Sequence, residues 1–275
     1  MYAKLPGLSQ RASEFVIDLA AEEFAVTWDA KMGRRKALSW LGALRLCLVR
    51  LRQNNTFEEL AETFAISNTT ACDYFHHMCA FLAGTIGCSL EDLKDRVSGK
   101  VHLVDGTLVP TWNWRHRKDL YSGKHKRYGA NVIIVADIHG RVAAASKPYP
   151  GSWHDKHAYD EAGLDTILAG SGGDLGDPGF QGTNLTTPTK KPPGGQLTDK
   201  QKANNKRIST VRVGVEWCIA HVKNWRIMTT RYRGELTHRF DNVIKAATGL
   251  QRLNDIFSTR TLSFARLQKK EAVSG

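Results

Sequence analysis

The sequence predicts an α/β protein in which a small all-α domain precedes a sheet flanked by helices. In most of the first hundred residues, apolar side chains recur at three- and four-residue spacing, the period of an amphipathic helix. The pattern then changes to short runs rich in valine and isoleucine, Val101–Thr107 and Val132–Ala136, which are typical of buried strands. Helical spacing returns after about Ile208. The chain therefore divides into a helical part and a sheet-containing part.

The boundary between these parts is predicted at Ser98-Gly99-Lys100, which ends a polar stretch. We expect a helical domain over residues 1–98, an α/β domain over 99–260 and a tail over 261–275. A chain of 275 residues is long enough for one large domain or two modest ones, each with a substantial core.

The charge balance favours a polyanionic partner. Lys and Arg number 39 against 27 Asp and Glu, which gives a net charge of +12. Nucleic acid is the obvious partner, and a solvated basic surface is the alternative. The sequence contains no apolar run of membrane-spanning length, the N-terminus lacks the apolar core of a signal peptide, and the five cysteines are irregularly spaced. We therefore expect a soluble cytoplasmic protein that is nucleoid-associated when bound to DNA.

Residues 56–80 have the sequence form of a helix-turn-helix. Thr56 and Glu59 form a capping box, and Ser67 is placed to cap a second helix after a short break. In a DNA-binding helix-turn-helix this second helix enters the major groove, so Asn68, Thr69 and Thr70 are predicted to reach base edges. A helical hairpin that binds no DNA is the alternative.

A zinc site is a weaker interpretation of the second helix. Cys72, His76 and Cys79 are spaced to share a face, but the sequence offers no close pair of cysteines and no clear fourth ligand. Thiols buried in a helical core explain the same spacing.

The run Val101–Thr107 predicts a strand that carries Asp105 at its end. An Asp-Gly pair after a strand is also a common turn, so the carboxylate needs partners elsewhere before a catalytic role is favoured. Downstream, Asp137–Gly140 predicts a tight hairpin turn into a strand over 141–146.

Basic and aromatic residues are interleaved between the predicted strands. Trp112 to Lys118 mixes both kinds, and Lys124, Lys126 and Arg127 follow. Such segments can neutralise phosphates and stack on unpaired bases. A solvated hairpin edge protected by positive charge is the alternative.

Two further aspartates are candidates for a second active acid. Asp155 begins a helix predicted to run to about Ala169, but Ser152 and Asp155 also make a capping box, and we favour that structural interpretation. Asp177 lies where a short glycine-rich strand ends, and its glycine neighbours allow close approach to a ligand. Asp177 is therefore the better candidate.

Residues 181–207 are poor in apolar residues and carry six cations against one acid, so either a disordered linker or a basic DNA-binding arm fits them; the cations include Lys190 and Lys191. A helix is predicted over 208–224. Arg212, Glu216 and Lys223 fall on one strip beside its apolar stripe. Surface pairing of Arg212 with Glu216 is the alternative to a role in a cleft.

The order of these features resembles a known family. The matching phrases are Val104-Asp105-Gly106-Thr107, Tyr121-Ser122-Gly123-Lys124, Pro150-Gly151-Ser152 with His154-Asp155, Asp177-Pro178-Gly179-Phe180, Lys190-Lys191-Pro192, and Arg212 with Glu216 and Lys223. Together they resemble the insertion-sequence transposases of the DDE superfamily, in the bacterial branch related to Harbinger elements. The resemblance implies a ribonuclease-H-like mixed sheet flanked by helices, with Asp105, Asp177 and Glu216 as catalytic metal ligands. It also implies phosphate contacts by Arg212 and Lys223.

The implied reaction is phosphodiester hydrolysis at the element's ends, followed by transfer of the 3′-hydroxyl ends to target DNA. Two hard cations about 3.5–4 Å apart suit such in-line displacements, so the resemblance implies two Mg²⁺ ions, with Mn²⁺ as a substitute. The partners are double-stranded DNA, as element ends and target, and other copies of the chain, because two ends must be joined.

The chain departs from the family pattern in a few places. Ser209 stands where the helix of the third acid usually carries tyrosine, and Phe180 replaces a common tyrosine. Neither removes a carboxylate. An active transposase is the leading interpretation, and a DNA-binding protein or nuclease that does not transpose is the alternative.

Overall fold

The computed structural model describes residues 4–28, 36–112, 114, 116–234 and 236–258. The predicted tail over 261–275 lies outside the described residues, as do Asn113 and Arg115 of the basic and aromatic segment. No helix in the described part of the chain is long and apolar enough to cross a membrane.

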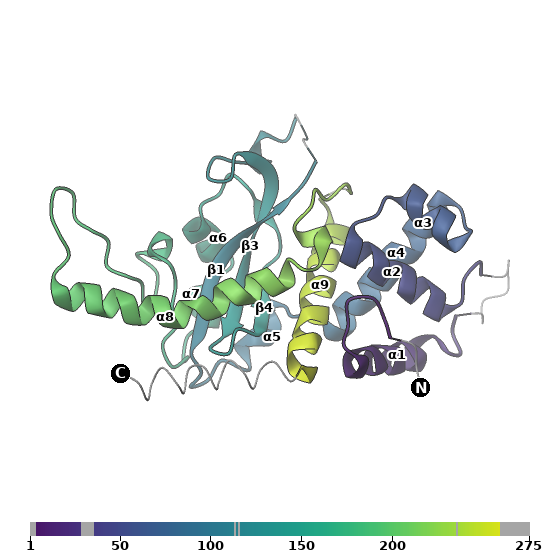
Figure 1. Ribbon diagram of the computed structural model, residues 1–275, viewed down its shortest axis with the longest axis horizontal. Coiled ribbons are helices and arrows are strands. Elements are labelled where there is room, and N and C mark those ends of the chain that lie inside the picture. Colours follow the sequence, from purple (N-terminus) through teal and green to yellow (C-terminus); the bar gives the residue numbers. More distant parts are fainter. Residues whose placement is uncertain (1–3, 29–35, 113, 115, 235, 259–275) are drawn as a thin grey trace.

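The N-terminal residues that the structure describes form five helices, the last of which packs against the sheet and not with the other four (Figure 1). They are α1 (Gln10–Phe24), α2 (Trp40–Gln53), α3 (Phe57–Phe64), α4 (Asn68–Ile86) and α5 (Leu90–Lys94). Both predicted caps are confirmed: Thr56 and Glu59 form a reciprocal capping box at α3, and Ser67 accepts from the Thr70 amide at α4. The helix-turn-helix pair is therefore α3 and α4, and local capping chemistry is sufficient to define where both helices begin.

A mixed sheet follows these helices, with strands β1 (His102–Pro110), β2 (Tyr121–Ser122), β3 (Arg127–Asp137), β4 (Val142–Ala145) and β5 (Tyr149–Pro150). β3 pairs antiparallel with β1 on one side and with β4 on the other, which confirms the predicted hairpin at Asp137–Gly140. Leu175 extends the sheet through a parallel bridge to Leu103, and Thr186 in turn bridges to Leu175. Three antiparallel strands with parallel extensions beyond β1, covered by helices, are the ribonuclease-H-like arrangement.

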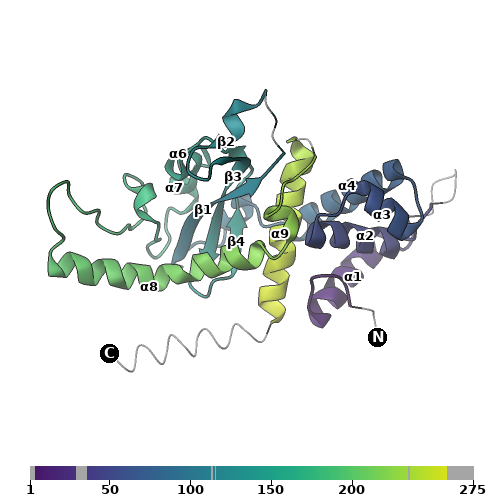
Figure 2. The ribbon, with the colours of Figure 1, turned by 45° about the horizontal axis from the view of Figure 1, so that its top comes forward.

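Helices cover both faces of this sheet (Figures 1 and 2). They are α6 (Asp155–Glu161), α7 (Leu164–Ile167), α8 (Asp199–Val222) and α9 (His238–Phe257), and short 3₁₀ turns lie at Lys118–Leu120, Pro178–Phe180 and Arg226–Met228. α8 and α9 lie on one face, where Leu103, Val109 and Ile134 join the main core. α5, α6 and α7 lie on the other, where Val104, Ile133 and Val135 form a second core. Alternation along β1 therefore sends successive side chains to different cores.

The main core is continuous across the predicted domain boundary. It contains α1, α2 and α4 residues together with residues of β1, α8 and α9. α9 packs against both α4 and β4, and it stands between the N-terminal helices and the sheet in both ribbon views (Figures 1 and 2). The last described helix therefore holds the two parts together.

Two predicted helices differ from the structure. The helix beginning at Asp155 ends at Glu161 and does not run to Ala169, because Gly163 adopts a left-handed φ of 64° before α7. α8 begins at Asp199 and not at Ile208, so the basic stretch before Ile208 is helical. A capping box formed by Thr198 and Gln201 starts α8 nine residues ahead of its first buried side chain.

Candidate functional site

The candidate site lies along β1, in the middle of the sheet. Asp105 pairs across the strands with Ile134, a residue of the main core, so its side chain points to the α8 face. The Asp105 side chain is 20% exposed. One oxygen accepts a hydrogen bond from the Gly106 amide at 2.9 Å, and the other lies 3.8 Å from Nη2 of Arg212 on α8. A carboxylate and a guanidinium thus meet between the strand and the helix.

The pKa of Asp105 is raised to about 6. Burial is the main cause, and the negative charges of Asp177 and Asp155 add to it, while Arg212 and the Gly106 amide oppose it. Burial therefore keeps the pKa high even though Arg212 and the Gly106 amide outweigh the two neighbouring acids. Such perturbed carboxyls gather at functional sites.

Asp177 occupies the predicted place after the strand residue Leu175. Its carboxylate caps the short turn Pro178–Phe180 by accepting from the Gly179 amide at 2.8 Å. The nearby Asp174 has a different role, because it is buried and accepts from the His102 amide at 2.8 Å and from the Ser171 hydroxyl at 2.6 Å. Asp174 therefore fastens the segment before Asp177 to the start of β1.

Close packing brings α8 onto the same face of β1. A methyl group at Gly214 would meet Leu103 at 2.8 Å, so glycine lets the helix approach the strand directly. Arg212 faces Asp105, and no ion pair joins it to Glu216 among the described residues. Nε of Arg212 is buried and has no hydrogen-bond partner within the described chain. The predicted alternative of a surface Arg212–Glu216 pair is therefore wrong.

Glu216 is exposed and lies one turn beyond Arg212 on α8. Lys223 ends the helix, and its ammonium interacts with the charge of Asp105, although burial lowers its pKa overall. Arg212, Glu216 and Lys223 fall within about 40° of one another around the helix axis. Glu216 therefore lies on α8 between two cations that both interact with Asp105.

Asp155 differs from its predicted role. The N-cap of α6 is His154, and no side chain caps this helix, so the predicted capping box of Ser152 and Asp155 is wrong. The Asp155 carboxylate instead accepts from Nδ2 of Asn131 at 2.9 Å and from Nζ of Lys124 at 3.0 Å. Local sequence suggested a cap, but two partners from other elements determine the side chain's direction.

Asp155 lies on the opposite face of β1 from Asp105. A methyl group at Gly106 would meet Asp155 at 2.2 Å, and Gly106 pairs with Ile133 of the second core. The carboxylate of Asp155 therefore packs directly on the bare backbone of β1, beneath the α6 face. Asp105 and Asp155 are close enough to interact electrostatically, but the strand separates them.

Lys124 extends from the loop between β2 and β3. Its side chain is 63% exposed, and its pKa is raised because the bond to Asp155 and the charges of Asp177 and Asp105 outweigh partial burial. Lys126 and Arg127 are exposed in the same hairpin, and Lys190 and Lys191 are exposed in the loop before α8. In the helix-turn-helix, Asn68 and Thr69 are exposed at the start of α4, while Thr70 is half-buried with its hydroxyl 2.8 Å from that of Ser67.

Sequence reasoning missed three side chains of the site. Asn131 stands alone as a polar residue inside an apolar strand run, which is the signal that could have identified it. His102 anchors Asp174 through Nδ1 at 3.0 Å. Thr107 lies two residues after Asp105 on the same face, is 5% exposed, and has a hydroxyl without a hydrogen-bond partner among the described residues.

The acidic groups do not form a compact metal cluster as they stand. Within the described residues, no three His, Cys, Asp or Glu side chains are gathered closely enough to hold an ion, and this applies also to Cys72, His76 and Cys79. The donor set of Asp105, Asp177 and Glu216 consists entirely of hard oxygen ligands, which Mg²⁺ prefers. The residues present therefore fit a hard divalent cation in their chemistry.

Comparison with known proteins identifies the family. Residues 104–252 match the model of a DDE superfamily endonuclease, and residues 37–87 match the helix-turn-helix of DDE superfamily endonucleases. The chain is 30% identical over 94% of both chains to a putative transposase for insertion sequence element IS112 of Streptomyces albus G. It is 21% identical to a probable transposase for insertion sequence element IS702 of Microchaete diplosiphon, over 84% of this chain and 86% of that protein.

One solved structure is also similar, the piggyBac transposase synaptic complex with hairpin DNA. It has a TM-score of 0.43 and 11% identity, over 90% of this chain and 72% of that one. The family models together span the helix-turn-helix and all three predicted acids. The chain therefore belongs to the DDE superfamily of endonucleases, as one of its insertion-sequence transposases.

Proposed function

We propose that this DNA transposase binds the terminal inverted repeats of its element, hydrolyses the phosphodiester bonds at the ends and transfers the 3′-hydroxyl ends to target DNA. The observation that carries the proposal is the position of Asp105. It interacts electrostatically with Asp177 at a strand end, and it faces Arg212 on the helix that bears Glu216. On this proposal, a strand, a later strand end and a helix would each contribute one acid to the same region.

Asp105, Asp177 and Glu216 are proposed as the catalytic acids, and Asp155 is not. The support is the alternation of β1, because Asp105 shares the α8 face with Arg212 while Asp155 packs on Gly106 from the other face. Both carboxylate oxygens of Asp155 also accept hydrogen bonds already, one from Asn131 and the other from Lys124. It is proposed as the residue that positions Lys124.

The three proposed acids would hold two Mg²⁺ ions, with Mn²⁺ as a substitute and Asp105 as the ligand shared by both. When bound, the ions would activate the attacking oxygen and stabilise the leaving oxygen of the displacement. The raised pKa of Asp105 supports this assignment, because a bound cation would compensate for the burial of its carboxylate and for the nearby charges of Asp177 and Asp155.

Cations around the acids would bind the phosphates of the DNA. Arg212 has a buried Nε without a partner in the described chain, and it presents a planar guanidinium suited to phosphate oxygens. Lys223 and Lys124 approach the acids from the other end of the α8 strip and from the β2–β3 loop. Lys126, Arg127, Lys190 and Lys191 would extend the backbone contacts.

The helix-turn-helix of the predicted 1–98 domain would select the element's ends. Asn68 and Thr69 are exposed at the N-terminal end of α4, the part of a recognition helix that reaches base edges. Thr70 would contribute after exchanging its bond with Ser67 for a contact to DNA. The 99–260 domain would perform the chemistry, and two copies of the chain would join on DNA so that both ends react together.

The test is nicking of a duplex that carries the short inverted repeats flanking the coding frame. We expect wild-type protein to release a 3′-hydroxyl at the repeat ends with Mg²⁺ or Mn²⁺, and not with EDTA. Transfer of that end into a second duplex would establish strand transfer. Binding without nicking under any of these conditions would overturn the enzymatic proposal and favour a DNA-binding protein, whereas nicking without joining would favour a nuclease that does not transpose.

A further inference from the structure

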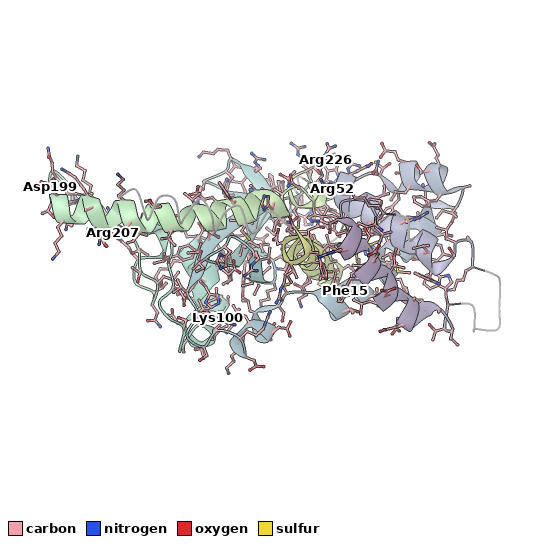
Figure 3. All side chains as sticks on the ribbon, turned by 60° about the horizontal axis from the view of Figure 1, so that its bottom comes forward. Phe15, Arg52, Lys100, Asp199, Arg207 and Arg226 are labelled. Atoms are coloured by element: carbon pink, nitrogen blue, oxygen red, sulfur yellow. The ribbon has the colours of Figure 1, made fainter. Side chains whose placement is uncertain are left out.

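The first part of α8 projects beyond the sheet. We call residues 187–207 the arm: it consists of the loop 187–198 and the first nine residues of α8, Asp199–Arg207. No residue of α8 before Ile208 is buried, and the ribbon views show this half of the helix extending away from the strands (Figures 1 and 2). Asp199 lies at its tip and Arg207 near its base (Figure 3). The sheet therefore does not explain why this segment is helical.

The arm is held together by its own polar contacts. Asn205 accepts from the Thr189 amide at 2.8 Å and donates to the Thr189 carbonyl at 2.9 Å, which ties the loop to the helix. Thr198 and Gln201 cap the helix reciprocally, at 3.2 and 2.9 Å. These bonds make the arm an ordered extension of α8.

The charges of the arm are unfavourable for the stability of the helix. The arm contains six cations and one acid, Asp199. The cations are Lys190, Lys191, Lys200, Lys202, Lys206 and Arg207. Lys200 and Lys202 lie in the first turn of α8, where the helix dipole is positive and a cation is unfavourable by about 0.3–1 kcal/mol. Lys202 is offset by an exposed ion pair with Asp199, and Lys200 has no ion pair among the described residues. Folding alone does not account for this arrangement.

We propose that the arm binds the sugar-phosphate backbone of duplex DNA next to the cleavage site, independently of sequence. This inference rests on the proposed function, which supplies the DNA, and it extends the backbone contacts proposed for Lys190 and Lys191 to the helical part of the arm. The lysines of the arm and the positive end of the α8 dipole together produce a positive electrostatic potential, which complements the negative charge of the DNA backbone. No base contact is required.

The continuity of α8 sets the distance between the arm and Glu216 along the helix axis. Lys206 and Lys200 precede Glu216 by 10 and 16 residues on a single helix, so they lie about 15 and 24 Å from it along the axis. At about 3.4 Å per base pair, these distances correspond to roughly four and seven base pairs. A duplex that runs along α8 would therefore be held by the arm at this spacing from the scissile phosphate.

The first test measures the salt dependence of binding to a 30-base-pair duplex of arbitrary sequence without divalent metal. A triple variant, Lys200→Gln, Lys206→Gln and Arg207→Gln, should lower the magnitude of the slope of log K against log salt by about 0.9 for each phosphate that the variant no longer neutralises. The matched control is Lys4→Gln, Lys94→Gln and Lys100→Gln, which makes the same charge change at exposed sites outside the arm. A slope equal to that of this control would overturn the proposal.

The second test is hydroxyl-radical footprinting on the duplex with the flanking inverted repeat. Wild-type protein should protect backbone positions roughly four to seven base pairs from the nick, and the triple variant should lose this protection while keeping that of the helix-turn-helix. Unchanged protection in the triple variant would contradict DNA binding by the arm. Because the salt test needs neither metal nor cleavage, it separates failure of the arm from failure of the proposed chemistry.

Discussion

The two faces of β1 place neighbouring acids in different surroundings. On the α8 face, Asp105 has a distant guanidinium, a raised pKa and exposed Glu216 one helix turn beyond that guanidinium. On the α6 face, Asp155 is fully engaged by Asn131 and Lys124 and packs on glycine backbone. Both aspartates lie close to Gly106 on β1, so distance alone does not distinguish their roles. The face of the strand that each occupies and the hydrogen bonds that each accepts do distinguish them.

The largest effect is expected from removing one of the three proposed catalytic acids. Asp105→Ala, Asp177→Ala and Glu216→Ala should each abolish detectable metal-dependent nicking, since each removes a proposed metal ligand. DNA binding without metal should persist, which checks that the variants fold. If Asp155→Ala abolishes nicking while Asp177→Ala does not, the two faces have the opposite roles.

A smaller effect is expected on the α6 face. Asp155→Asn and Lys124→Gln should each slow nicking roughly 10- to 100-fold, as is common when a residue that orients a reacting group is altered. The double variant should be no slower than the worse single variant, because both changes disrupt one ion pair. Multiplying effects would show that Asp155 acts independently of Lys124. Lys156→Gln, which removes an exposed pair with Asp160, serves as the control.

The pH dependence of protein stability tests whether the pKa of Asp105 is raised. Its pKa of about 6 lies above the ordinary 3.8, so the folded protein loses stability as pH rises from about 4 through 6. Asp105→Asn should therefore raise the thermal midpoint in EDTA by a few degrees at pH 7.5, an upper limit of about 3 kcal/mol, and the gain should fall to about a third of that at pH 4.5.

Divalent metal provides the control for this measurement. Mg²⁺ should raise the midpoint of wild-type protein at pH 7.5 but not that of Asp105→Asn. Asp255, whose pKa burial also raises to about 6, lies on α9. Asp255→Asn should reproduce the pH effect and leave the Mg²⁺ effect intact. An equal Mg²⁺ effect in Asp105→Asn would contradict a metal role for Asp105.

The smallest effect concerns packing between the faces. Gly106→Ala places a methyl group against the Asp155 carboxylate, so we expect a loss of about 1–3 kcal/mol in denaturant unfolding. Combining it with Asp155→Ala should recover most of that loss, because the obstructing carboxylate is gone. No recovery would mean that Asp155 does not obstruct a side chain at position 106.

Local signals made much of this structure predictable from the sequence. The Asp137–Gly140 hairpin and the Thr56 and Ser67 caps depend on residues a few positions apart, and all are confirmed. The β1 strand is confirmed in its place, but it continues to Pro110, so the prediction that Asp105 ends the strand is wrong: Asp105 and Gly106 both pair with β3 inside it. The role of Asp155 was wrong because Asn131, 24 residues away, prevails over a local capping pattern. The start of α8 was wrong because its first nine residues carry no apolar stripe and are stabilised by capping and loop contacts.

The placement of α9 has a consequence for biosynthesis. The apolar side of α4 is completed by a helix that ends about 170 residues later in the chain. At a synthesis rate of about 5–20 residues per second, that partner is made on the order of ten to thirty seconds after α4. A ribosome that stops early therefore releases a helix-turn-helix with an unfilled core.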